Sequence, residues 1–420
     1  MRARSMTRHA DASKARAAVR HGRLRKSNPF ATVAKVIAAT AAVVGVSGIA
    51  VAGVAALDLA NSVKPVAHLD NETPGAPPPN IGAIEGGVNL LLVGSDSGDG
   101  NEAYGERDEN LNDVTILMHI SADHSSATVV SFPRDMYVPI GDCANGGNGR
   151  DKMNTALMYG GADGGLACAV STVEGITGLS IPFAAQIGFD GVISMSNAVG
   201  GVPVCVTEPL NDAWSGINLD VGTHDLSGAS ALAFLRSRHG VGDGSDLSRI
   251  SNQQVFLSSL VRTLKSSETL SDPIKLYSIA RAALKNVTLS NSLNNIDTMV
   301  SIAAALKDIP LDRVAFVQTP TATVEGGVEA TSDADVLWTA LQSDQAVALS
   351  ATGKYVVTDP NAPVTPDPAA TDAAADPAAP VDPSAPVDPA AGGAVALPDT
   401  ITGQNAAQNT CTAGRPEEDQ

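Results

Sequence analysis

Aromatic residues are scarce in this chain: seven Phe, five Tyr and two Trp make up 3% of its 420 residues. A core built mainly on large rings is therefore excluded, although hydrophobic residues account for 44% of the sequence. The core must consist of Val, Leu, Ile and Ala, which suits buried strands and close-packed helices. The length allows one large domain or two ordinary ones.

Positively charged residues are few in most of the chain compared with acidic ones. Ten of the 27 Lys and Arg residues, but only one of the 45 acidic residues, lie before residue 36. The remainder carries 17 basic and 44 acidic residues, a net charge of −27. Because binding to a phosphate backbone requires a basic surface, no nucleic acid is expected as a partner.

One long hydrophobic run follows the basic N-terminus. The segment "VIAATAAVVGVSGIAVAGVAAL", residues 36–57, holds no charge, and about 20 apolar residues suffice to span a membrane. The basic flank before it predicts a cytoplasmic tail over 1–32, a signal-anchor helix over 33–57 and an extracytoplasmic domain of a single-pass cell-membrane protein. A cleaved signal peptide is the alternative, but the run exceeds the ~7–15 apolar residues typical of one.

Cysteine is also rare, and all four cysteines follow the hydrophobic run, where disulfides persist. Full pairing of Cys143, Cys168, Cys205 and Cys411 allows three connectivities. The sequence does not choose among them; we favour Cys143–Cys168 because it would staple a Gly-rich stretch, and Cys411 is either tethered or free. No Cys–His spacing resembles a zinc site.

A Pro-rich linker over 58–85 leads into a region with alternating strand and helix patterns, which predicts one α/β domain over 86–350. Apolar runs predict strands, and helical periodicity predicts helices. The expected strands are 88–96, 113–121, 127–135 and 314–320, the expected helices are 164–178, 227–239, 245–267, 275–285, 295–307 and 333–343, and 183–206 fits strand, helix, Gly-Gly turn, strand.

The C-terminal region changes composition. Residues 359–391 are a Pro/Ala/Asp tract, which cannot bury a core. We therefore expect a disordered tail over 351–420.

Two acids lie at the ends of neighbouring predicted strands. Asp96 follows the first strand in "VGSDSG", a near miss for the nucleophile elbow G-x-S-x-G that disfavours a serine hydrolase. Asp113 begins the next strand. Together they suit a hard cation such as Mg²⁺, which prefers carboxylate oxygens. The alternative, a loop-capping Asp96 and a solvated Asp113, stays open.

Arginines collect in the stretch "AFLRSRHGVGDGSDLSR". Arg236 and Arg238 are two residues apart and would leave the same face of an extended segment. Arg249 falls in the first turn of the next helix and shares its face with Gln253. A cation there is unfavourable for the helix dipole unless an anion is bound as well. A helix N-terminus behind a glycine-rich loop is a ready anion site, because the loop backbone can approach a phosphate closely.

Arg134, at the end of the third strand, adds a fourth guanidinium. Surface salt bridges with Asp243 and Asp246 are the alternative for any one arginine. Four arginines near two candidate metal ligands favour a bound pyrophosphate, because arginine suits bidentate phosphate binding. The loop lacks the G-K-[ST] ending of a P-loop, which disfavours nucleotide hydrolysis.

The chain closely resembles the LytR-CpsA-Psr proteins of Gram-positive cell envelopes over residues 86–265. The resemblance rests on seven ordered segments, "NLLLVGSDS", "NDVTILMHIS", "VVSFPRDMYVPI", "DKMNTALMYGG", "FDGVISMSNAVGGVPV", "LSGASALAFLRSRH" and "GDGSDLSRISNQQVFL". It implies an α/β/α sandwich with a central mixed sheet. It also implies transfer of a glycopolymer from a polyprenyl-pyrophosphate carrier to a peptidoglycan hydroxyl, with Mg²⁺ (or Mn²⁺) and release of polyprenyl phosphate.

The resemblance also implies roles for individual residues. The metal acids would be Asp96 and Asp113, and these two with Arg134 would be catalytic. The pyrophosphate would be bound by Arg134, Lys152, Arg236, Arg238, Arg249 and Gln253. Arg107 is a weaker match, because the family's usual arginine stands closer to the second acid, where this chain has "NLN".

Cleavage of a phosphoanhydride requires charge neutralisation on its oxygens, and either acid is suited to act as general base. A lipid chain also requires an apolar cavity, for which the segments "LACAVSTVEGI" and "VFLSSLV" are candidate walls. Two other functions remain: a lipid-pyrophosphate hydrolase, and a non-catalytic envelope sensor or regulator acting through the basic tail.

Overall fold

The computed structural model describes residues 54, 57–59, 67–70, 87–97, 104, 110–147, 149–359 and 393–415. The chain divides into two compact units, Met1–Leu57 and Asp58–Gln420, and the fold below is that of the second. The predicted cytoplasmic tail over 1–32, most of the predicted anchor and linker, and Arg107 lie outside the described residues. Within them, none of the helices combines the length and apolar character needed to cross a membrane.

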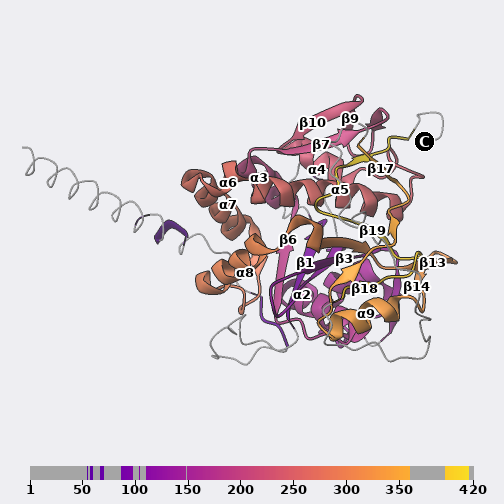
Figure 1. Ribbon diagram of the computed structural model, residues 1–420. Coiled ribbons are helices and arrows are strands. Elements are labelled where there is room, and N and C mark those ends of the chain that lie inside the picture. The colour runs from indigo at the N-terminus through magenta and orange to yellow at the C-terminus, as the bar shows by residue number, and fades with distance from the viewer. Residues whose placement is uncertain are drawn as a thin grey trace, which may run out of the picture. The chain divides into compact units, whose positions relative to one another are not determined.

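An eight-stranded mixed sheet forms the centre of the domain, in the order β11-β6-β1-β2-β3-β12-β19-β16 (Figure 1). β1 pairs antiparallel with β2 and parallel with β6. The mixed central sheet predicted from the sequence is confirmed. Its strands are β1 (Val88–Ser95), β2 (Asn112–Ile120), β3 (Ala127–Phe132), β6 (Phe183–Ile187), β11 (Val287–Leu289), β12 (Val314–Gln318), β16 (Ala351–Thr352) and β19 (Thr402–Asn405).

Helices cover both faces of this sheet. The side chains of β1 alternate: Leu91 and Val93 belong to the core beneath α2 and α9, whereas Leu92 packs in the core beneath α5, α7 and α8. This period of two with both faces buried explains the continuous apolar run of the strand. The helices are α2 (Ala156–Thr177), α3 (Phe189–Val199), α4 (Ala229–Arg236), α5 (Asp246–Lys265), α6 (Ser267–Leu270), α7 (Pro273–Asn286), α8 (Ile296–Asp308) and α9 (Ala334–Gln342), with 3₁₀ turns η4 (Met153–Thr155) and η5 (Leu311–Arg313).

A second sheet, in the order β10-β7-β20-β17, packs on α4 and α5. Its strands are β7 (Val202–Val206), β10 (Gly222–Leu226), β17 (Val356–Thr358) and β20 (Thr410–Thr412). The short two-stranded pairs are β4 (Tyr137–Pro139) with β5 (Arg150–Lys152), β8 (Leu210–Asp212) with β9 (Ile217–Leu219), β13 (Thr321–Val324) with β14 (Gly327–Ala330), and β15 (Val347–Ala348) with β18 (Val395–Ala396).

The prediction of a disordered tail over 351–420 is wrong for residues 351–359 and 393–415. β19 lies between β12 and β16 in the central sheet, and β20 lies between β7 and β17. Both strands are too short to be recognised from their own sequence; they gain their hydrogen bonds from strands distant in the chain. The Pro/Ala/Asp tract lies outside the described residues.

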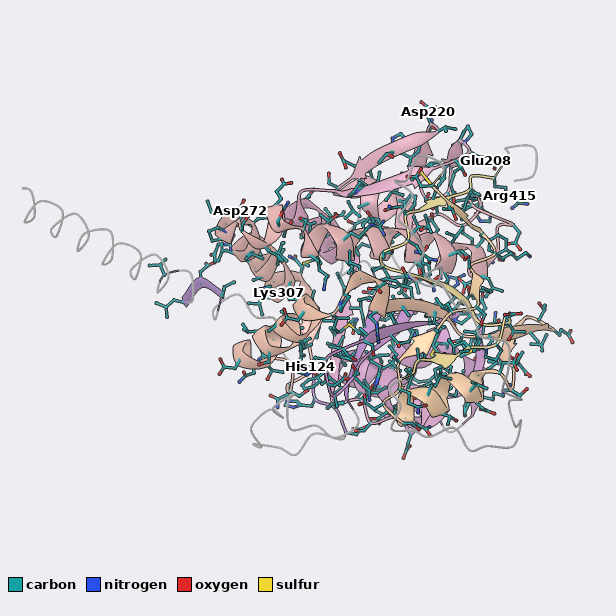
Figure 2. All side chains as sticks on the ribbon, viewed as in Figure 1. His124, Glu208, Asp220, Asp272, Lys307 and Arg415 are labelled. Carbon is teal, nitrogen blue, oxygen red and sulfur yellow. A yellow bond between two sulfur atoms is a disulfide. The ribbon has the colours of Figure 1, made fainter. Side chains whose placement is uncertain are left out.

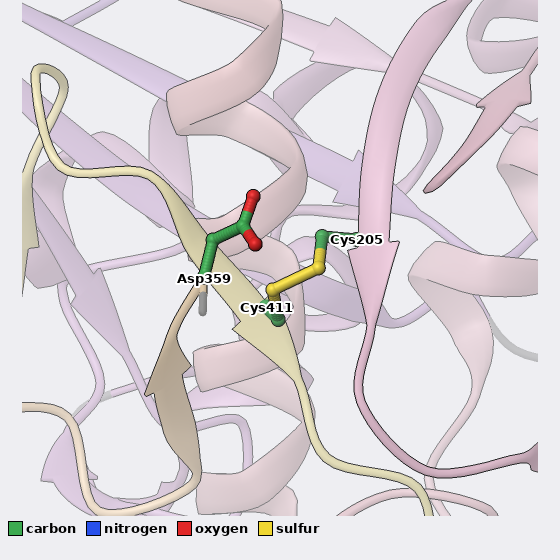
Figure 3. A group of neighbouring side chains, drawn as sticks. All are labelled: Cys205, Asp359 and Cys411. Atoms are coloured by element: carbon green, nitrogen blue, oxygen red, sulfur yellow. A yellow bond between two sulfur atoms is a disulfide. The ribbon is translucent and has the colours of Figure 1, made fainter. Parts of the chain in front are cut away.

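Two disulfides close the domain. Cys143–Cys168 is formed as expected, with a sequence separation of 25. Cys205 of β7 is bonded to Cys411 of β20, across 206 residues (Figure 3). Cys411 is therefore tethered, and the second disulfide fixes the C-terminal segment to the domain.

Candidate active site

A cavity of about 300 Å³ lies beside β1 and β2 and is walled by α3, α4 and α5. Its lining is almost wholly apolar, with Val192 and Met195 from α3, Leu232 from α4, and Leu257 and Leu260 from α5. The expectation that the segment "VFLSSLV" borders such a cavity is met by α5. The same expectation for "LACAVSTVEGI" is wrong, because this part of α2 packs in the core on the opposite face of the sheet.

Arg249 and Gln253, at the start of α5, line the cavity together with Ser95, Asp113 and Arg236; Arg249 donates to the carbonyl of Asp113 and Gln253 to that of Leu235, the neighbour of Arg236, so these polar groups lie at one end. A β-bulge explains the place of Asp113. Gly94 pairs with Val114 but Ser95 pairs with Asn112, so Asp113 is the extra residue on β2. Bulges of this kind re-aim side chains next to functional sites.

Asp113 and Arg134 form the central ion pair, with Arg134 Nη1 2.6 Å from Asp113 Oδ1. The backbone N–H of Arg134 donates to Asp246 Oδ2 at 3.0 Å. Burial alone would lower the pKa of Arg134, but the carboxylates of Asp113, Asp135 and Asp246 outweigh it and raise the pKa. Arg134 therefore stays charged within the site.

Arg249 is held from two sides. Its Nη2 donates to the carbonyl of Asp113 at 2.8 Å and lies 2.7 Å from Asp246 Oδ1. The pair with Asp246 is the salt bridge weighed from the sequence, yet it is a buried pair, with both side chains 7% exposed. The Nε–H of Arg249 is also buried and has no hydrogen-bond partner among the described residues. An unpaired charged donor on the cavity wall is suited to an anionic ligand.

Arg236, the last residue of α4, lies over the ring of Phe189 with 4.5 Å between its Cζ and the ring centroid. Tyr104 meets the same ring edge-on at 5.0 Å, and its hydroxyl donates to Asp190 at 2.6 Å. Burial and the Asp190 carboxylate raise the pKa of Tyr104 to about 12. These contacts hold the Arg236 guanidinium at the cavity.

Arg238 is placed differently. Its Nε donates to the carbonyl of Gly244 at 3.1 Å, and it is not among the described residues that line the cavity. The expectation that Arg236 and Arg238 leave one face of an extended segment is wrong, because Arg236 still belongs to α4 and the chain turns at Ser237.

Asp212 shapes this turn. It is fully buried, and its Oδ2 accepts hydrogen bonds from the hydroxyl of Ser237 and from the backbone N–H groups of Arg238, His239 and Gly240 at 2.9–3.2 Å. Burial alone would raise the pKa of Asp212, but these bonds outweigh it and lower the pKa. Asp212 therefore positions the segment between the arginines.

The glycine-rich loop packs against protein. A Cβ on Gly240 would lie 2.7 Å from the carbonyl oxygen of Asn211, and one on Gly242 would lie 2.6 Å from Ser248 Cβ. A Cβ on Gly244 would collide with the guanidinium of Arg415. The close approach expected for a phosphate is thus occupied by neighbouring chain segments, including the C-terminal one.

Asp96 and Lys152 stand further out. Asp96 is buried, and its Oδ1 accepts from the N–H of Leu111 at 3.0 Å, which bears out its loop-capping role. Lys152 Nζ lies 3.2 Å from Asp135 Oδ1 and thus adjoins the Arg134 cluster. Neither is among the described residues that line the cavity.

The chemistry of Asp96 and Asp113 suits a hard divalent cation, because such a cation prefers carboxylate oxygens. Asp113 Oδ2 accepts no hydrogen bond from the described residues, because only Oδ1 binds Arg134. Mg²⁺ typically binds one or two carboxylates together with substrate phosphates and water. A different cluster, Cys205, Asp359 and Cys411, has suitable spacing, but Figure 3 shows its two sulfurs bonded to each other, so it offers no thiolate ligand.

Several residues of the site were missed by the sequence analysis: Phe189, Asp190, Asp135 and Asp212. Asp246, by contrast, was named from the sequence, because its spacing of three residues from Arg249 on one helix is a recognisable signal. Phe189 contacts Arg236, 47 residues later in the chain, and Asp212 binds the backbone of Arg238, 26 residues later, so no local pattern connects them.

A family model described as the LytR_cpsA_psr family matches residues 58–348. The chain belongs to this family. Over 273 residues it is 31% identical to the cell wall biosynthesis protein LcpA of Corynebacterium glutamicum, covering 58% of this chain and 52% of LcpA. Over 223 residues it is 30% identical to the polyisoprenyl-teichoic acid–peptidoglycan teichoic acid transferase TagU of Oceanobacillus iheyensis, covering 53% of this chain and 64% of TagU.

The chain thus spans less than two thirds of each of these relatives. Among solved structures, the LytR-Csp2A-Psr enzyme from Actinomyces oris superposes with a TM-score of 0.51 and 21% identity, covering 66% of this chain and 96% of the enzyme. This likeness shows the fold.

Proposed function

We propose that the protein is a membrane-anchored phosphotransferase that moves a glycopolymer from a polyprenyl-pyrophosphate carrier to peptidoglycan during cell wall assembly. The observation that carries the proposal is the apolar cavity with Arg236, Arg249, Asp113 and Gln253 gathered at one end. An isoprenoid chain fits the apolar wall, and a pyrophosphate fits the guanidinium groups. The relatives named as teichoic acid transferases support the reaction type.

The acceptor hydroxyl attacks the phosphorus that bears the glycan. A new P–O bond forms, the phosphoanhydride bond breaks, and polyprenyl phosphate leaves. Arg236 and Arg249 neutralise charge on the phosphate oxygens, with Arg134 held close by Asp113. The hydroxyl proton passes to one of the two candidate metal carboxylates, Asp96 or Asp113, either of which is suited to act as general base.

Mg²⁺ (or Mn²⁺) completes the proposal. When bound by Asp96 and Asp113, it supplies further charge neutralisation on the pyrophosphate. The side chain of Arg238 donates to the carbonyl of Gly244, and that of Lys152 pairs with Asp135. To bind the glycan-side phosphate, each of them would exchange this partner for a phosphate oxygen.

The location is part of the same proposal. The uncharged run over 36–57, preceded by basic residues, supports a single-pass anchor with the N-terminus in the cytoplasm. The Cys143–Cys168 and Cys205–Cys411 disulfides support an oxidising, extracytoplasmic setting for the domain.

Product analysis tests the proposal. The full chain is incubated with a polyprenyl-pyrophosphate oligosaccharide, Mg²⁺ and peptidoglycan fragments, and the products are identified by mass spectrometry. We expect a glycan joined to peptidoglycan through a phosphodiester. Free glycan phosphate would instead indicate the hydrolase, and bound but intact substrate would indicate a sensor. Deletion of residues 2–26 distinguishes the transferase from the regulator, because a transferase should keep its activity without the basic tail and a regulator acting through that tail should not.

A further inference from the structure

The cavity has a direction along α5. Arg249 and Gln253 line its polar end, and Leu264 lines it near the last turn of the helix. Fifteen residues at 1.5 Å each place these ends about 22 Å apart. The apolar end therefore lies where α5 gives way to α6 and α7.

The α6–α7 region exposes apolar side chains at this end. Ile274 is 76% exposed, Leu276 41% and Leu270 38%. Exposed apolar residues gathered on one short segment mark a contact surface, whereas single ones do not.

The charge of α7 is unusual for this chain. The helix carries Lys275, Arg281 and Lys285 and no acidic residue, in a region with net charge −27 after residue 35. The carboxylate of Asp272 before it caps the N–H groups of Ile274 and Lys275. Glu268 is the acid of α6. Apolar residues beside cations suit the interface of an anionic bilayer.

The start of the domain is joined to the same helix. Asp58 accepts a hydrogen bond from the hydroxyl of Tyr277 at 2.5 Å and lies 2.9 Å from Arg281 Nε. Asp58 directly follows the uncharged run over 36–57. Asp58, the first residue after the apolar run, is thus bound to α7, the helix that carries the exposed apolar side chains.

We propose that α6 and the first turn of α7, with Leu270, Ile274 and Leu276, form a surface that rests in an anionic lipid bilayer and passes the polyprenyl chain from the membrane into the apolar end of the cavity. The delivery of a lipid chain rests on the proposed function; contact with the bilayer does not.

Fluorescence quenching tests the contact. The full chain is reconstituted into anionic vesicles with brominated acyl chains, and an added tryptophan is introduced as Ile274→Trp or Val221→Trp. Val221 is 59% exposed and follows Asp220, which lies far from Asp272 in Figure 2. We expect bromine to quench the added emission of Ile274→Trp at least about twofold and to leave that of Val221→Trp unchanged. Equal behaviour of the two variants would overturn the proposal.

Donor presentation tests the delivery. We expect Ile274→Glu to lower transfer about tenfold from a long-chain donor in the bilayer, because a charge at the interface opposes contact. Transfer from a short-chain, water-soluble donor should not change, and Val221→Glu should change neither. Equal loss with both donors would overturn delivery by this surface. Failure of the wild-type protein with both donors would instead reject the proposed function, and the quenching result would stand on its own.

Discussion

Arg134 Nη1 lies 2.6 Å from Asp113 Oδ1, and this pair joins the turn that follows β3 to the bulge at the start of β2. The bulge gives Asp113 two roles at once. One oxygen fixes an arginine, and the other faces no protein donor among the described residues. The reaction proposed here requires both oxygens.

Asp113→Ala should therefore abolish transfer. We expect a fall of at least about 100-fold, the effect of removing one preorganised charged group from an active site. Arg150→Ala is the control, because it removes an exposed ion pair with Glu329. Rates are compared under saturating donor, and thermal unfolding shows whether each variant folds. An Asp113→Ala protein within twofold of wild type would contradict the role given to this residue.

Arg236 and Arg238 should differ, although the sequence makes them look equivalent. Arg236 lines the cavity, whereas Arg238 donates to the Gly244 carbonyl. We expect Arg236→Ala to lower kcat/KM by about 100-fold or more and Arg238→Ala by about tenfold or less. Steady-state kinetics with one lipid donor decides this, and the reverse order would show that Arg238 turns toward substrate.

Asp212→Asn should destabilise the protein, because both carboxylate oxygens accept hydrogen bonds, Oδ2 from four donors and Oδ1 from the N–H groups of Trp214 and Ser215, whereas an uncharged amide has only one acceptor oxygen. We expect the free energy of unfolding to fall by about 3 kcal/mol at neutral pH. The pKa of Asp212 is lowered in the fold, so its stabilisation is complete above the ordinary value of about 3.9 and is lost as pH falls through the lower folded pKa.

Urea unfolding at pH 7 and pH 3 measures this dependence. The stability gap between wild type and Asp212→Asn should shrink at pH 3, whereas Asp220→Asn, at an exposed position, should show no gap at either pH. A gap that stays constant with pH would exclude the carboxylate as its source.

The two disulfides should stabilise the domain unequally. Cys411→Ser opens a loop of 206 residues and Cys143→Ser one of 25. Loop-closure entropy predicts that the first costs about 2 kcal/mol more than the second. Denaturant unfolding of the two variants gives the comparison; an equal or smaller cost for Cys411→Ser would mean that the C-terminal strands hold without their tether.

Sequence patterns predicted the parts of the structure that depend on local periodicity. The amphipathic pattern of α5 was enough to place Arg249 and Gln253 on one face, and the apolar run of β1 was enough to place it inside the sheet. Arg238 could not be placed, because its direction depends on Asp212, 26 residues earlier. β19 and β20 were missed, because two short strands acquire their structure only by pairing with β12 and β7. The exposed apolar residues of α6 and α7 likewise could not be recognised from the sequence as a contact surface, because that interpretation depends on their position near Asp58 and the cavity.

The most direct test of the account follows the phosphorus atom. A polyprenyl-pyrophosphate glycan is labelled with ³²P at the phosphorus next to the sugar and supplied to the full chain with peptidoglycan and Mg²⁺. We expect the label to become covalently bound to peptidoglycan and unlabelled polyprenyl phosphate to be released. Label that stays with the lipid while glycan reaches peptidoglycan, or label released as a soluble phosphate, would contradict the proposed reaction.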